Sequence, residues 1–233
     1  MRKEKWDIDS FVHLIRRGVR GLPIVRGDSD KWRHLKTLFY MNDVHVGIHA
    51  IRDVESMINK RQIKLFEWPK SWPKRQPLFT LCAFTLLDTH IHQIGIEKIE
   101  KGISKFMHKS GIGTAKYFNL KYGEKGGLFQ TPYQARVIDS DEYLRWAVAY
   151  VLVKNTFEMH PKGLQWATKN FEDAWEWANH YPFSSFGDYA GTTRNSPIVD
   201  TEDLKKILGG PKEFKGLCRD MILGRKEKPL VFE

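Results

Sequence analysis

The chain has 233 residues, 41% of them hydrophobic and 13% aromatic, so it can bury a core and is not an intrinsically disordered chain. Its basic N-terminus lacks the apolar stretch of a signal peptide, and no apolar run reaches the roughly 18 residues that span a bilayer. We therefore expect a cytoplasmic protein without a membrane segment. The formal net charge of +10 favours a polyanionic partner, with nucleic acid first and an anionic membrane surface second.

The first third of the chain alternates between extended and helical patterns. Residues 8–26 read as an extended apolar segment that breaks at two glycines. After the capping sequence GDSD, residues 31–43 place apolar side chains at helical spacing. Residues 67–77 contain three prolines and two tryptophans among basic residues, which is typical of a loop. We read this loop as a connector, with stacking on nucleic-acid bases as the alternative.

A very apolar run, residues 78–87, is typical of a strand buried on both faces, and the segment that continues it or forms its exit carries His90 and His92. Side chains two apart in a strand point to the same face, so the two imidazoles would project together as half of a metal site. His45 and His49 form a competing pair at helical spacing. Because the chain has nine histidines, spacing alone leaves the metal role open.

The second half of the chain is mainly helical in pattern. Residues 97–111 predict an amphipathic helix, and residues 128–138 a short extended piece. A Ser-Asp capping signal begins a further helix over residues 140–157. Residues 164–191 hold aromatic-rich turns, and residues 200–233 add at least one helix and a basic tail.

Several stretches match the motifs of one family in the family's own order. The triplet His90-Ile91-His92 has the pattern histidine, bulky hydrophobic residue, histidine. The other matching stretches are FVHLIRRGVRGLPIV, FMHKSGIGTAKYFNLKYGEKGGLFQ, DSDEYLRWAVAYVLVKN and YPFSSFGDYAG. Together, over residues 11–199, they resemble the REP-associated tyrosine transposases, within the wider single-tyrosine HUH transposase family.

The resemblance implies an α+β fold, in which a ferredoxin-like antiparallel sheet with flanking helices forms the HUH endonuclease domain over residues 8–191. Residues 192–233 would add a helical C-terminal extension and the basic tail. The family's activity is metal-dependent cleavage and rejoining of single-stranded DNA next to hairpins, through a covalent phosphotyrosine intermediate. Relatives include monomers and homodimers, so both states stay open for this chain.

Two other functions remain as alternatives. A domesticated regulatory protein would keep the fold and hairpin binding but would not cleave DNA. An RNA-binding protein is the third reading, since a basic groove and base stacking do not distinguish RNA from DNA. Retention of His90, His92 and Tyr150, which matches the family's catalytic tyrosine, favours the enzyme. A protein that only binds DNA has no chemical need for all three.

The resemblance also assigns roles to residues. Tyr150 matches the family's nucleophile. A phenol is more acidic than an aliphatic hydroxyl and is therefore the better leaving group. Tyr143 is the competitor, because it stands seven residues earlier, almost two full helical turns, and could lie on nearly the same helix face. His90 and His92 would hold Mg²⁺ or Mn²⁺, of which Mn²⁺ accepts imidazole more readily. Asn155 is the candidate third ligand.

One departure from the family concerns this third ligand. The family's polar residue stands four positions after the tyrosine, where this chain has Lys154, and Asn155 comes fifth. In an ideal α-helix Asn155 would lie about 140° around the axis from Tyr150. The helix is therefore distorted at this point, or Asn155 is not a ligand.

Basic side chains near these positions are candidate nucleic-acid contacts, namely Arg16, Arg17 and Lys154. Asp88 and Gln93 flank the histidines and could supply ligand oxygens, although Gln93 should point to the opposite face of the strand. His13 is either a DNA-facing or a structural histidine.

Overall fold

A computed structural model describes residues 6–191 and 196–224 of the chain. Within them, one antiparallel sheet has the strand order β2–β3–β1–β4. The strands are β1 (Phe11–Arg17), β2 (Phe79–Leu86), β3 (His90–Glu97) and β4 (Gln134–Ile138). Helices α1 (Asp28–Tyr40) and α2 (Ala50–Asn59) connect β1 to β2, and α3 (Gly102–Tyr122) connects β3 to β4. This βαββαβ succession is the ferredoxin-like arrangement, so the predicted fold class is confirmed.

The histidine segment is a strand of its own at the centre of the sheet. The strand predicted over residues 78–87 corresponds to β2, which turns back at Leu87–Thr89 into β3. The N–H of Leu87 donates to the carbonyl of His90, which closes this hairpin. Because β3 pairs with both β1 and β2, its side chains are held in a fixed register from both sides.

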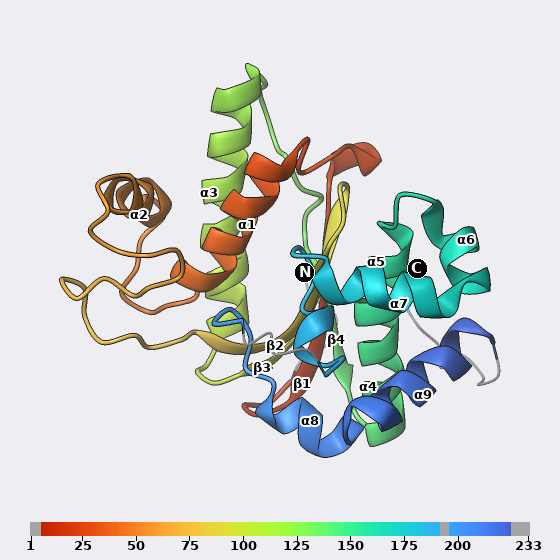
Figure 1. Cartoon of the computed structure of the whole chain (residues 1–233). Coiled ribbons are helices and arrows are strands. Elements are labelled where there is room, and N and C mark those ends of the chain that lie inside the picture. The colour runs from red at the N-terminus through yellow and green to blue at the C-terminus, as the bar shows by residue number, and fades with distance from the viewer. Residues whose placement is uncertain (1–5, 192–195, 225–233) are drawn as a thin grey trace.

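Helices cover both faces of the sheet. Figure 1 shows α1 and α3 against one face and the helices that follow β4 against the other. The second set comprises α4 (Asp141–Ala149), α5 (Asn155–Glu158), α6 (Gly163–Lys169), α7 (Phe171–His180), α8 (Glu202–Leu208) and α9 (Pro211–Ile222). Short 3₁₀ turns lie at Val19–Gly21 and Phe186–Asp188. The predicted Ser140 cap is present, since its Oγ accepts the N–H of Tyr143.

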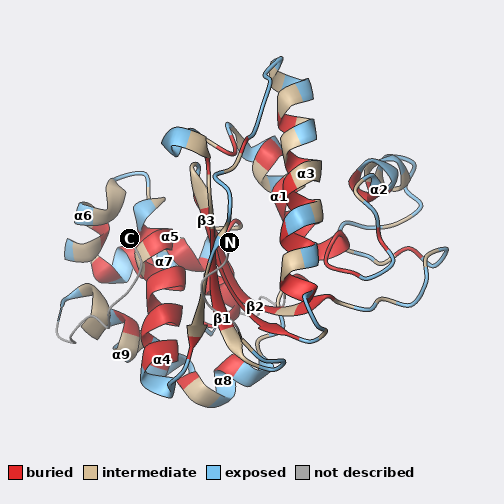
Figure 2. Ribbon diagram, turned by 180° about the vertical axis from the view of Figure 1, so that it is seen from behind, coloured by how far each residue is buried: buried red, intermediate tan, exposed pale blue. Residues whose placement is uncertain are grey.

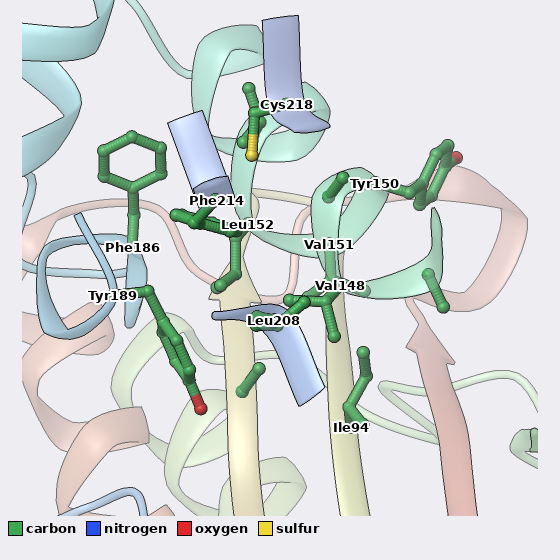
Figure 3. Packing of buried hydrophobic residues seen from close by; sticks show 14 of the residues in the cluster. Ile94, Val148, Tyr150, Val151, Leu152, Phe186, Tyr189, Leu208, Phe214 and Cys218 are labelled. Atoms are coloured by element: carbon green, nitrogen blue, oxygen red, sulfur yellow. The ribbon is translucent and has the colours of Figure 1, made fainter. Parts of the chain in front are cut away.

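Each face of the sheet has its own hydrophobic cluster, as the buried residues in Figure 2 indicate. On the α4 side, Val148 lies over Ile94 of β3, and Leu152 belongs to the same cluster (Figure 3). Leu208 of α8 and Phe214 of α9 enter the same cluster. The extension predicted over residues 192–233 is therefore helical in its described part and shares the core of α4. Its basic tail lies outside the described residues.

Helix α2 and the proline-rich loop over residues 67–77 show details that the sequence patterns do not give. Helix α2 was not predicted, because its mixed charged sequence shows little beyond an amphipathic face at Ile51 and Val54. In the proline-rich loop, Trp68 stacks on Tyr40 at 6.4 Å and Trp72 lies across Trp68 at 5.1 Å. These rings pack on the end of α1, which favours the connector reading of the loop.

No helix in the described part of the chain has the length and apolar character needed to cross a membrane.

Candidate active site

His90 and His92 lie on one face of β3, and their rings are neighbours. The two ring centroids are 4.9 Å apart, with His92 fully buried and His90 half-buried. In the ladder with β1, His90 lies opposite Arg17 and His92 opposite Ile15. Side chains alternate along a strand, so the histidines and Arg17 share the face on which α4 packs.

Both imidazoles are neutral at neutral pH. Burial lowers the pKa of His90 to about 4, and the positive charge of Arg17 acts in the same direction. Burial also lowers the pKa of His92 well below its usual value, with a further contribution from His13. A neutral imidazole keeps a lone pair that can bind a metal ion.

Hydrogen bonds orient the two rings. The Nδ1 atom of His90 lies 2.8 Å from Oγ1 of Thr89, and Nδ1 of His92 lies 3.0 Å from Nε2 of His13. The Nε2 atom of His92 is buried and has no hydrogen-bond partner among the described residues. This nitrogen of His92 could therefore bind a ligand.

Tyr150 lies against the histidines. Its ring centroid is 5.6 Å from that of His92, in an edge-on arrangement, and 5.1 Å from that of Trp146, in a stacked one. In Figure 3 the Tyr150 ring points away from the core cluster that Val148 and Leu152 enter. Tyr143 lies in the first turn of α4, where Arg136 of β4 is 5.8 Å from its ring. Of the two candidates, Tyr150 is the one placed at the histidines.

The helix is distorted between Tyr150 and Asn155. Residues Tyr150–Lys154 form one turn of π-helix, here called the π-turn, between α4 and α5. The N–H of Asn155 donates to the carbonyl of Tyr150, five residues earlier instead of four. In a turn closed by an i→i+5 bond, the residue five positions later lies one turn beyond the first. The π-turn thus absorbs the extra residue and returns Asn155 to the side of Tyr150.

Unpaired buried atoms indicate a missing partner at this place. Asn155 is fully buried, and neither its Oδ1 nor its Nδ2 has a hydrogen-bond partner within the described residues. Buried polar atoms are paired in the great majority of cases, so Asn155 and Nε2 of His92 point to a ligand. Residues 6–191 and 196–224 contain no group of three or more His, Cys, Asp or Glu side chains that could hold a metal. Two imidazoles and one amide oxygen, completed by water or substrate oxygens, make a donor set that fits a divalent ion.

Lys154 adds a positive charge beside the tyrosine. Its Nζ is 5.2 Å from the centroid of the Tyr150 ring and 2.9 Å from Oε2 of Glu158. Burial would lower the pKa of Lys154, but the hydrogen bond to Glu158 and the proximity of Tyr150 raise it on balance. Lys154 therefore remains charged, and both Lys154 and Arg17 lie near the histidines.

Arg16 occupies a different environment from the one predicted. Neighbouring residues of a strand face opposite ways, so Arg16 points away from the histidines, toward α3. Its guanidinium donates to the carbonyl of Met107 and to Oγ of Ser110. A Cβ at Gly111 would lie 2.6 Å from this guanidinium, so glycine is needed there. We correct the prediction accordingly: Arg16 packs between the sheet and α3 and is not at the site.

The other candidates lie outside the site. Gln93 faces the α3 side, where it lines a small cavity with Arg16. Asp88 pairs with Lys31 at 3.0 Å. His45 lies in a bend and His49 precedes α2, so this pair does not share a helix face.

Sequence reasoning missed three contributors. Trp146 stacks on the tyrosine, Glu158 pairs with Lys154, and His13 contacts His92. Trp146, Tyr150, Lys154 and Glu158 are spaced by four residues, a signal for one helix face that the sequence carried. No comparable signal links His13 to His92, because their contact crosses two strands.

Comparison with known proteins finds similarity to a solved structure. No protein-family model and no curated protein matches the chain. A solved structure of a REP-associated tyrosine transposase bound to a REP hairpin is similar to it, with 13% sequence identity and a TM-score of 0.41. The match covers 86% of this chain and 93% of the other. That protein belongs to the family that the sequence motifs resemble.

Proposed function

We propose that this protein is a metal-dependent, single-stranded DNA endonuclease and transposase that cleaves and rejoins DNA next to hairpins. The observation that carries the proposal is the contact between Tyr150 and His92, with ring centroids 5.6 Å apart. A phenol beside a pair of neutral imidazoles is the combination that a tyrosine nucleophile with a metal cofactor requires.

In the proposed reaction the Oη atom of Tyr150 attacks the phosphorus of a phosphodiester. A bond forms between Oη and phosphorus as the phenol gives up its proton. The bond to one deoxyribose oxygen breaks, and that oxygen takes up a proton and leaves as a hydroxyl. The phosphotyrosine retains the energy of the phosphodiester, so attack by a DNA hydroxyl can rejoin the strand without another energy source. Arg17 and Lys154 would offset the negative charge of the phosphate.

His90 and His92 would hold the divalent ion, with Oδ1 of Asn155 as an oxygen ligand. Bound there, Mg²⁺ or Mn²⁺ would supply charge stabilisation at the scissile phosphate. The chain's own contribution is to keep both imidazoles neutral through burial. Thr89 orients His90, and His13 orients His92.

The proposed partner is single-stranded DNA with hairpins, and the proposed location is the cytoplasm. Tyr150 and the histidines meet within one chain, so the site as proposed needs no residue from a second copy. Either a monomer or a homodimer would therefore carry the tyrosine in cis.

The test is incubation with hairpin-bearing single-stranded DNA from beside the protein's own gene, with Mn²⁺ or Mg²⁺, followed by a denaturing protein gel. We expect a slower-migrating covalent adduct that requires the metal. The Tyr150→Phe variant should bind the hairpin and form no adduct, whereas Tyr143→Phe, the matched control on the same helix, should form it. Hairpin binding without any adduct in the wild-type protein would favour the non-cleaving regulatory protein instead.

A further inference from the structure

A residue of strand β2 holds the π-turn. Thr85 is fully buried and lies directly opposite His92 in the β2–β3 ladder. Its Oγ1 donates a 2.7 Å hydrogen bond to the carbonyl oxygen of Val151, the second residue of the π-turn. One hydroxyl group therefore connects β2, the neighbour of the histidine strand β3, with the helix of the tyrosine.

Two further hydroxyl groups lie beside this bond. Oγ of Ser184 lies 2.8 Å from Oγ1 of Thr85, and Oγ1 of Thr156 lies 3.3 Å from it and donates to Oγ of Ser184 at 2.8 Å. A carbonyl can only accept, so the one proton of the Thr85 hydroxyl goes to Val151, and the hydroxyl oxygen can accept from Ser184. Ser184 is also held by the N–H of Phe186, at 3.1 Å. The Tyr-Pro-x-Ser-Ser segment thus acts as a support for Thr85.

A wide turn inside an α-helix needs such support. A π-turn departs from the regular i→i+4 ladder, and a buried carbonyl deprived of a donor costs about 1–3 kcal/mol. The bond from Thr85 removes this cost only while Val151 stays where the π-turn places it. Without the bond, the segment can relax into a regular α-helix, in which Asn155 would lie about 140° around the axis from Tyr150.

We propose that Thr85 is a positioning residue whose hydroxyl holds the π-turn and so keeps Asn155 on the side of Tyr150. The catalytic consequence rests on the proposed function, whereas the effect on the π-turn does not. Thr85 touches no reacting atom and acts through the backbone of Val151.

Three variants test the proposal in the full-length protein. Thr85→Val removes the hydroxyl and keeps the shape, and Thr85→Ser keeps the hydroxyl. Thr80→Val is the control, because Thr80 lies on the same strand near the end far from His92. The measurements are amide hydrogen exchange in residues 150–156, Mn²⁺ affinity by calorimetry without DNA, hairpin affinity, and the rate of adduct formation.

For Thr85→Val we expect faster exchange in residues 150–156, weaker Mn²⁺ binding, and adduct formation slowed by about 10- to 100-fold with hairpin affinity unchanged. Thr85→Ser and Thr80→Val should behave like the wild type. Unchanged exchange in Thr85→Val, or equal losses in Thr85→Val and Thr85→Ser, would overturn the proposal. If the wild-type protein forms no adduct, the proposed function fails, and the exchange data still decide whether Thr85 holds the turn.

Discussion

The Nε2 atom of His13 lies 3.0 Å from the Nδ1 atom of His92, and the two rings stack with centroids 5.3 Å apart. Both histidines are fully buried, and burial lowers the pKa of His13 to about 4. One ring nitrogen of this pair must carry the shared proton and the other must accept it. The contact therefore sets the orientation of His92 and leaves its Nε2 directed at the site.

Replacing His13 should weaken metal binding. For His13→Ala we expect the Mn²⁺ affinity to fall about 10- to 100-fold, because His92 loses the partner that orients its ring. Calorimetry without DNA measures this directly. The matched control is His34→Ala, since His34 is also buried with its pKa lowered by burial to about 4, but it lines the cavity on the α3 side. Equal Mn²⁺ affinities in His13→Ala and wild type would refute the orienting role.

Stability should fall on mild acidification. Burial lowers the pKa values of His13, His34 and His90 to about 4, and that of His92 further still. The unfolded chain takes up protons on these side chains near pH 6.5, whereas the folded chain does not until the pH approaches 4. Within this window acid favours unfolding, by on the order of 1 kcal/mol per pH unit for each histidine. Urea denaturation between pH 7 and pH 5 measures the trend.

A second buried group titrates outside that window. Burial alone would raise the pKa of Asp30, but hydrogen bonds from Lys121, Tyr122 and Tyr117 and from the backbone of Arg26 lower it to about 2. Its stabilising effect is thus present above pH 4 and is lost only below it. If the buried histidines cause the loss of stability on mild acidification, the unfolding free energy of His34→Gln should depend less steeply on pH between pH 7 and pH 5, by about one proton. An unchanged pH dependence in His34→Gln would contradict the role of the histidines.

Substitutions of Arg16 and of Arg17 should affect DNA binding differently. Arg17 shares the face of the histidines, so Arg17→Gln should weaken hairpin binding and reduce the salt dependence of the affinity by about one phosphate contact. Arg16→Met should leave that salt dependence unchanged, because the Arg16 guanidinium is bound to α3. Affinities measured between 50 and 200 mM salt distinguish the two. The same decrease in both variants would contradict the assignment of opposite faces.

The sheet was predictable because its strands have simple patterns. The apolar run before His90 is β2, and the His-x-His spacing places both imidazoles on one face. The same alternation places Arg16 and Arg17 on opposite faces of the sheet, although the sequence analysis predicts both as DNA contacts. The π-turn was harder, since the sequence showed only that Asn155 was out of phase with Tyr150 in an ideal helix. What holds the turn, the bond from Thr85 to Val151, joins residues 66 positions apart.

The most direct test of the account is to find which residue becomes bonded to DNA. The adduct formed with Mn²⁺ and a hairpin substrate would be digested with nuclease and trypsin and analysed by mass spectrometry. Cleavage after Arg145 and Lys154 yields the peptide WAVAYVLVK, whose one tyrosine is Tyr150, while Tyr143 falls in the preceding peptide. We predict a nucleotide phosphate on Tyr150. A nucleotide on the Tyr143 peptide, or an adduct that persists in Tyr150→Phe, would contradict the account.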